Sequence, residues 1–320
     1  MLIGSHLSIA GGMVNALVEA RRLKMDCVQV FTKNQRQWNA PPISIEARGA
    51  WLDELRRMKW DRATARVVSH NSYLINLASP DQALWKKSLV AQRDEIERCE
   101  TLHIPLCVMH PGAHLLGPRP VRQPNDLNGQ PTPDELKGLD SIIRALDHMH
   151  RDLPGYRTNT CLVTTVGSGT NLGYSFQQLA FIRAGVSYPE RLGFCFDTCH
   201  VTAAGYDMST AERTNAVIAQ FDDICGLANL RVFHLNDSIG ALGSRVDRHV
   251  HIGHGTCGLA CFRTIVNHPK FSSVPMILET PKETDDKGRQ WDVLNVRRLK
   301  RMVRRVAVCR YPVLPPLGPR

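Results

Sequence analysis

The sequence GFCFD, at residues 193–197, is a short apolar run that ends in an aspartate and is followed at once by TCH at residues 198–200. Its apolar residues do not alternate strictly with polar ones, which is typical of a strand buried on both faces. Similar short runs recur along the chain, and we predict a strand in each of them: Met1–Ser5, Cys27–Thr32, Arg66–His70, Pro105–His110, Thr160–Thr165, Leu230–Asn236 and Pro275–Thr280.

Helical patterns lie between these predicted strands, at Ala10–Lys24, Ala47–Lys59, Asp81–Thr101, Pro133–Met149, Ser175–Ala184 and Ser209–Cys225. Eight strands that alternate with helices are typical of a (β/α)8 TIM barrel, and a doubly wound open sheet is the competing architecture. We predict a single-domain α/β barrel over residues 1–305. The stretch Leu115–Thr132, rich in Pro, Gly and Asn, is predicted to be an inserted loop, and residues 306–320 a disordered tail.

The composition fits a core of this size, because 43% of the 320 residues are hydrophobic. No apolar run reaches the length of a membrane span, and the N-terminus lacks the pattern of a signal peptide, so we expect no membrane contact and a cytoplasmic location. The ten cysteines include no CxxC pair and are expected to be reduced and buried. The net charge of +10 favours a polyanionic partner. Part of it lies in residues 297–305, which form either a DNA-facing patch or the solvated face of a last helix.

Histidine, aspartate and glutamate, the residue types that most often bind metal ions, stand at or just beyond the ends of several predicted strands. They are His70, His110, Asp197, His200, His234, Asp247, His249 and Glu279. Side chains at the C-terminal ends of barrel strands converge on one site. Asp247 and His249 are two residues apart, so they point the same way on an extended chain. Imidazole and carboxylate groups together suit zinc, with manganese or iron where oxygen dominates. Eight such groups indicate two or three ions, which could activate a nucleophile and hold the oxygens of a phosphate.

Nine motifs carry a resemblance to a known family: GSHLSIAGG near the start, FTKNQRQW (31–38), HNSYLINLASP (70–80), HPGAH (110–114), GTNLGYSF (169–176), FDTCHVTAAGYD (196–207), HLNDS (234–238), GSRVDRHVHIG (243–253) and LETPK (278–282). Together they resemble the endonuclease IV family of apurinic/apyrimidinic endonucleases, built on a xylose-isomerase-like barrel. The likeness runs from Met1 to about Arg305. It implies a zinc enzyme that cuts double-stranded DNA 5′ to an abasic site and leaves a 3′-hydroxyl. It also implies a monomer.

The resemblance further implies the role of each candidate residue. His70 and His110 would hold one zinc, Asp197, His234 and Glu279 a second, and His200, Asp247 and His249 a third, with Asp197 and Glu279 essential for catalysis. Arg36, Tyr73 and Leu74 match residues that enter the DNA and replace the flipped-out abasic nucleotide. Lys33, Arg36 and Arg248 are expected to contact the DNA backbone, although Arg248 could instead only brace its loop.

One position departs from the family pattern. The family carries a glutamate that bridges the first and second zinc ions where this chain has Val163, and no Asp or Glu occurs between Asp152 and Glu190. Three hypotheses follow. The chain is an abasic-site endonuclease with an attenuated or differently filled metal site, a catalytically impaired DNA-binding relative, or a metal-dependent sugar isomerase or epimerase. The net charge and the FTKNQRQW and HNSYLINL motifs argue against the sugar enzyme.

Overall fold

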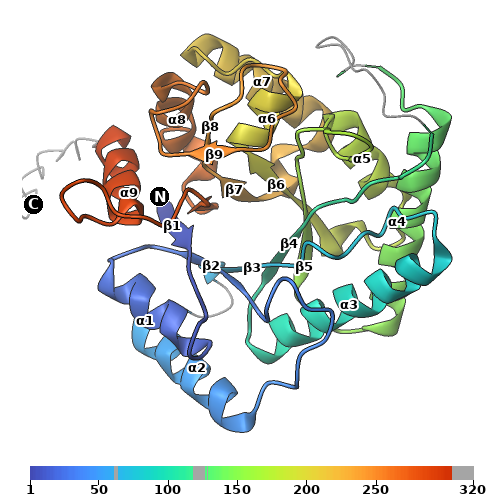
Figure 1. Ribbon diagram of the computed structural model, residues 1–320, viewed down its shortest axis with the longest axis horizontal. Coiled ribbons are helices and arrows are strands. Elements are labelled where there is room, and N and C mark those ends of the chain that lie inside the picture. The colour runs from blue at the N-terminus through green and yellow to red at the C-terminus, as the bar shows by residue number, and fades with distance from the viewer. Residues whose placement is uncertain (61–63, 118–126, 128, 305–320) are drawn as a thin grey trace, which may run out of the picture.

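A closed barrel of eight parallel strands forms the centre of the protein, and the helices surround it (Figure 1). The computed structural model describes residues 1–60, 64–117, 127 and 129–304. The barrel strands are β1 (Leu2–His6), β2 (Val28–Phe31), β3 (Val67–His70), β4 (Leu106–Met109), β5 (Asn159–Val163), β6 (Leu192–Asp197), β7 (Leu230–His234) and β10 (Pro275–Leu278). They follow one another around the barrel in chain order, and β10 pairs with β1 to close it. The predicted barrel is therefore confirmed, and an open sheet is excluded.

The longer helices also match the prediction, within four residues at each end. They are α1 (Val14–Arg22), α2 (Ile45–Met58), α3 (Gln82–Thr101), α4 (Pro133–Asp152), α5 (Phe176–Gly185) and α7 (Ala211–Cys225). A last helix, α9 (Trp291–Met302), carries the basic run. The sequence patterns missed α6 (Thr198–Ala204), α8 (Leu259–Val266), the hairpin of β8 (Asp237–Ser238) and β9 (His249–Val250), and the short 3-10 helices η3 (Pro189–Arg191), η4 (Leu227–Asn229) and η5 (Pro269–Phe271).

Helix α6 begins directly at the end of strand β6. The Asp197 side chain accepts a hydrogen bond from the backbone N–H of His200 (2.9 Å), which satisfies one of the unpaired N–H groups at the helix start. The helix ends after seven residues at Gly205, whose φ of 123° favours glycine. Asp197 thus ends a strand and caps a helix, and this fixes His200 beside it.

Two apolar layers hold the barrel together. The outer layer fills the space between strands and helices and contains the largest buried side chains, such as Trp51 and Phe221. The layer inside the barrel consists of aliphatic and cysteine side chains: Cys27, Val68, Leu106, Val108, Cys161, Val163, Cys195, Val232 and Ile277. Every cysteine in the described part of the chain is buried and unbridged, as expected. Burial raises the pKa of the Cys27 thiol to about 12, so this thiol stays protonated.

Three predictions concern segments at the margins of this fold. Among the described residues, no helix has both the length and the apolar character needed to cross a membrane. Most of the predicted insertion, Leu115–Thr132, and all of residues 306–320 fall outside the described ranges. The predictions of an inserted loop and a disordered tail therefore stay predictions.

Candidate metal centre

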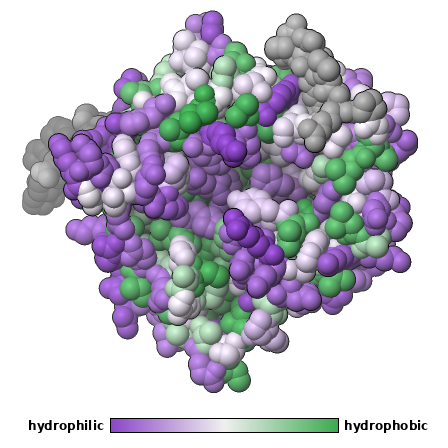
Figure 2. Space-filling model, in the orientation of Figure 1, coloured by the Kyte–Doolittle hydropathy of each residue, from purple (hydrophilic) through white to green (hydrophobic). Residues whose placement is uncertain are grey.

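The C-terminal end of the barrel carries a ring of side chains, one from the end of each strand. Because side chains alternate across a strand, the inward-facing residue nearest the C-terminal end of each strand belongs to this ring, and Val163 of the inner apolar layer is one of them. These ring positions are His6, Gln29, His70, His110, Val163, Asp197, His234 and Glu279. Figure 2 shows that the centre of this face is hollowed and lined mainly with hydrophilic side chains. Seven of the eight ring positions are polar, and Val163 is the exception.

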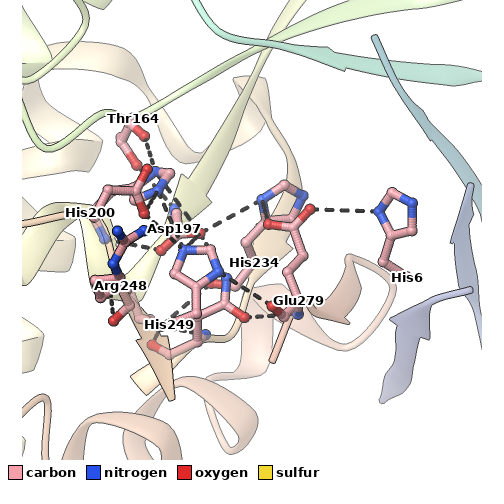
Figure 3. A network of polar contacts seen from close by, with 12 residues as sticks. His6, Thr164, Asp197, His200, His234, Arg248, His249 and Glu279 are labelled. Atoms are coloured by element: carbon pink, nitrogen blue, oxygen red, sulfur yellow. Dashed lines mark hydrogen bonds and ion pairs between the residues drawn. The ribbon is translucent and has the colours of Figure 1, made fainter. Parts of the chain in front are cut away.

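Asp197, His234 and Glu279 form the first group that could hold a metal ion. They come from neighbouring strands and point toward one another (Figure 3). One donor atom from each lies within 4.8 Å of the other two. His234 Nδ1 lies 3.0 Å from Glu279 Oε2 and 3.6 Å from Asp197 Oδ2. The structure therefore brings together the three residues that the resemblance assigns to the second zinc.

His200, Asp247 and His249 form a second such group at the edge of the mouth. Asp247 Oδ1 lies 3.2 Å from His200 Nε2 and 3.4 Å from His249 Nε2. Asp247 and His249 do point the same way, as their spacing predicted. Asp197 lies between the two groups, since its Oδ2 atom is also 3.7 Å from His249 Nε2. A third combination adds Cys199 to Asp197 and His249, but burial raises the pKa of the Cys199 thiol and so disfavours the thiolate that a metal requires.

His70 and His110 lie beside each other, with ring centroids 5.4 Å apart, and His70 also lies near His234. Burial is the main cause that lowers the pKa of His70 to about 3 and that of His110 to about 4, so both imidazoles are neutral near pH 7. Among the described residues, no carboxylate completes a three-donor group with this pair. Val163, the ring position on the next strand from His110, is fully buried and has no donor atom.

Each of four histidines has one ring nitrogen fixed as a hydrogen-bond donor. Nδ1 donates to a backbone carbonyl oxygen in three of them: His70 to Asn71 (2.8 Å), His200 to Thr164 (2.7 Å) and His249 to Glu279 (3.3 Å). His234 is turned the other way, and its Nε2 donates to the side-chain oxygen of Gln29 (2.8 Å). In the neutral imidazole the second nitrogen is then left to donate its lone pair to a cation.

The two carboxylates near His200 determine its charge. Burial lowers the pKa of His200, but Asp197 and Asp247 outweigh it and raise the pKa to about 9. Burial raises the pKa of Asp247, and the facing His200 and His249 outweigh it and hold that pKa below its ordinary value. A proton between His200 and Asp247 thus balances the local negative charge. A divalent cation would take the place of this proton, because both groups must be deprotonated to bind it.

Gln29 and His6 belong to this network, although the sequence analysis did not select them. The Gln29 amide donates to Glu279 Oε1 (2.6 Å) while its oxygen accepts from His234. The amide nitrogen Nε2 of Gln29 also lies 2.9 Å from His6 Nδ1. Gln29 therefore orients two of the three members of the first group. The sequence feature that could have identified Gln29 is its place as a polar residue at an inward position of an otherwise apolar strand, CVQVF.

We predict that Gln29→Leu lowers the affinity for zinc by about 10- to 100-fold, because His234 and Glu279 lose the amide that orients them. Zinc competition against a coloured chelator measures this directly. The matched control is Gln178→Leu, which removes a similarly buried glutamine on α5 whose amide oxygen accepts from the Gly173 N–H (2.7 Å) and not from a ring residue. Equal zinc affinity in the Gln29 variant and the unmodified protein would contradict the positioning role.

The predicted DNA-contacting residues lie around the mouth. Arg36 and Arg248 are exposed, and Leu74 is half-buried. Tyr73 is 62% exposed, and its ring packs against His70 and His110, with centroids 5.2 and 5.9 Å away. A groove of about 890 Å³ adjoins the ring, and its walls include His6, Phe31, Arg36 and Lys282. An aromatic side chain and a cation thus flank the histidines.

Lys33 also lines this groove, but its charge is already paired with carboxylates of the protein. Its side chain is 1% exposed, and its Nζ atom lies 2.5 Å from Asp94 Oδ2 and 3.6 Å from Glu95 Oε1. Both carboxylates belong to α3, whose packing against the segment after β2 buries the lysine. Lys33 therefore fastens this segment to α3, and the expectation of a backbone contact is corrected.

Comparisons with known proteins agree with this geometry. Residues 17–302 match the family described as xylose isomerase-like TIM barrel. The chain is 44% identical over 305 residues to “Probable endonuclease 4” of Geobacter sulfurreducens, an alignment that covers 95% of each protein. The crystal structure of endonuclease IV from Thermus thermophilus aligns with a TM-score of 0.76 and 30% identity, over 94% of this chain and 98% of that one.

A more distant likeness bears on the sugar-enzyme hypothesis. A D-tagatose 3-epimerase-like protein aligns with a TM-score of 0.65 at 17% identity, over 94% of this chain and 97% of that one, which shows a shared fold alone. The endonuclease relatives match this chain in sequence as well as in fold, over nearly its whole length. The chain belongs to the endonuclease IV family, within the xylose isomerase-like TIM barrels.

Proposed function

We propose that this protein is an apurinic/apyrimidinic endonuclease that acts as a monomer in base-excision repair and hydrolyses the phosphodiester 5′ to abasic sites in double-stranded DNA. The observation that carries the proposal is the pair of His/carboxylate groups that share Asp197 at the bottom of an open mouth. The groups lie beside the exposed Tyr73 and the groove that Arg36 lines.

The donor sets fit divalent zinc at two places. Asp197, His234 and Glu279 would hold one ion, and His200, Asp247 and His249 another, since imidazole nitrogen with carboxylate oxygen is a common zinc environment. Manganese fits the same donors less selectively. His70 and His110 offer only two donors and do not complete a third site of this kind. We therefore assign two ions to the protein and leave the neutral His70 and His110 as hydrogen-bonding groups.

The bound ions would supply Lewis acidity for phosphate hydrolysis. The protein's own side chains would do the rest. Tyr73 and Leu74 would fill the space that the abasic nucleotide leaves in the duplex, and extruding a sugar without a base costs less than unstacking a paired base. Arg36 and Arg248 would hold the phosphate backbone irrespective of sequence. His70 Nε2 is unprotonated near pH 7, because Nδ1 donates to Asn71, and it could accept a hydrogen bond from water.

The test uses a duplex with one stable abasic-site analogue and a matched intact duplex, incubated with the zinc-loaded protein. We expect a single cut 5′ to the analogue, a 3′-hydroxyl product and no cut in the intact duplex. Prior removal of metal with a chelator should abolish the cut, and added zinc should restore it.

Two other outcomes would favour the remaining hypotheses. Tight binding of the abasic duplex without a cut, under any divalent metal, would identify a catalytically impaired relative, which the loss of a carboxylate at Val163 would explain. Conversion of a ketose without DNA binding would identify a sugar epimerase on the same barrel. The exposed aromatic and arginine residues at the mouth favour a DNA-binding protein over the sugar epimerase, and only the incision assay separates the nuclease from the impaired relative.

A further inference from the structure

A second basic hollow lies on the flank of the barrel, outside the mouth. We call it the flank groove. It has a volume of about 840 Å³ and lies along α9 and α8. Six arginines line it: Arg263, Arg289, Arg297, Arg298, Arg301 and Arg304. Only two acidic residues, Asp285 and Asp286, share this lining. Six arginines against two aspartates leave an excess of four positive charges.

Most of these arginines have no acidic partner. Arg289 is paired with Asp285 at 2.6 Å, and Arg298 donates to the backbone oxygen of Ile252. Across the described part of the chain, no carboxylate lies within ion-pair distance of Arg263, Arg297, Arg298, Arg301 or Arg304. The one acidic residue of α9, Asp292, is occupied by Lys282 at 2.7 Å.

This pattern differs from that of an ordinary solvated helix face. Such a face usually places acidic residues three or four positions from basic ones, and each pair stabilises the helix. In α9 the residues at these spacings are both basic, as with Arg297 and Arg301, and like charges at these spacings destabilise a helix. A bound polyanion would relieve this repulsion.

The flank groove adjoins the mouth of the barrel. The loop between β10 and α9 separates them, with Glu283, Thr284 and Gln290 lining the mouth groove and Asp285, Asp286, Arg289 and Trp291 lining the flank groove. The Trp291 ring stacks on His251, with centroids 3.9 Å apart, and His251 follows the site residue His249 by two positions. In Figure 1, α9 lies in the outer ring of helices, beside β1. The flank groove begins at the loop beside the mouth and runs along α9 toward the start of the strands, where Lys300 pairs with Asp26 (2.8 Å). A ligand that leaves the mouth over this loop and turns along the flank of the barrel can therefore reach the flank groove.

We propose that the flank groove binds the phosphodiester backbone of duplex DNA beyond the incision site, an inference that rests on the proposed function. Guanidinium groups match phosphate oxygens in geometry as well as charge. From Arg297 to Arg301 the helix α9 advances four residues, about 6 Å at helical rise, which corresponds to about two nucleotides along one strand. The contact is independent of sequence, since only backbone oxygens meet the arginines.

Salt dependence of DNA binding tests the proposal without requiring any cut. The zinc-loaded protein is titrated with intact duplexes of about 12 and about 30 base pairs, and the Arg297→Gln/Arg301→Gln double variant is compared with the unmodified protein. Affinity for the long duplex should fall at least about tenfold, and the slope of log affinity against log salt should drop by about 1.8, or about 0.9 for each lost phosphate contact. Affinity for the short duplex should change little.

The matched control is Arg56→Gln/Arg57→Gln, which removes two exposed arginines from α2, where both are paired with acidic residues. It lowers the net charge equally and should leave the slope unchanged. An unchanged slope in the α9 variant, or an equal loss in both variants, would overturn the proposal. Incision of an abasic duplex too short to reach α9 serves as a separate readout of the proposed function. It should keep its kcat in the α9 variant, so failure of the nuclease activity and failure of the flank groove are distinguishable.

Discussion

Replacing Asp197 with asparagine should lower the rate of incision at an abasic site by on the order of 10³-fold, equivalent to about 4 kcal/mol of transition-state stabilisation. Asp197 is fully buried, and its Oδ2 atom lies within 4 Å of both His234 and His249. It is the carboxylate that the two metal-binding groups share. An amide has the same shape but no negative charge, so both groups would lose the anion that balances bound cations.

Single-turnover incision, measured with enzyme in excess over the abasic duplex, isolates this loss from product release. Zinc content and the melting temperature of the variant should be recorded alongside, since Asp197 also caps α6 and asparagine keeps that role. The control is Asp140→Asn, on the exposed side of α4, which should leave the rate unchanged. A loss of less than about tenfold in the Asp197 variant would show that the two groups do not act as one centre.

Replacing Val163 with glutamate should raise the zinc content from about two to about three ions per chain. Val163 occupies the one apolar position of the ring, next to the strand that ends before His110. A carboxylate there would join the two imidazoles of His70 and His110 and give them a third donor. We also expect faster incision, by about tenfold or more, because a further cation would stabilise the charge that develops on the phosphate.

The same substitution should destabilise the metal-free protein by a few kcal/mol, because it buries a carboxylate that lacks a cation. Added zinc should reverse this loss, so the melting temperature of the variant should depend on zinc more steeply than that of the unmodified protein. Val163→Gln provides the control. Glutamine has a shape similar to that of glutamate but no charge, so this variant should bind no additional ion. Metal analysis that finds three ions per chain already in the unmodified protein would contradict our assignment of two.

The barrel and most of its ring could be predicted from sequence because both depend on local patterns. Each strand is a short apolar run, and a residue that binds metals often stands at or just beyond its end, as with His70 and His234. Alternation along a strand then decides which residues face inward. The pairing of Asp247 with His249 could be predicted for the same reason, since side chains at i and i+2 point the same way on an extended chain.

The features that were missed depend on contacts between distant parts of the chain. Helix α6 is too short to show an amphipathic period, and its first turn is stabilised by Asp197, which reads as the end of a strand. The burial of Lys33 depends on Asp94, 61 positions further along the chain. Gln29 acquires its role only when closure of the barrel places it beside His234, 205 positions away.

The ring of strand ends also has an evolutionary consequence. Each strand contributes one residue to the ring, while the rest of the strand packs against its neighbours and the helices. A substitution in the ring can therefore change the number of donor atoms by one and leave the folding of the barrel almost untouched. Chemistry on such a scaffold can diverge in single steps, each of which yields a folded protein that selection can test. Val163, the one apolar position of the ring, is the place where a single substitution would add a donor without changing the barrel.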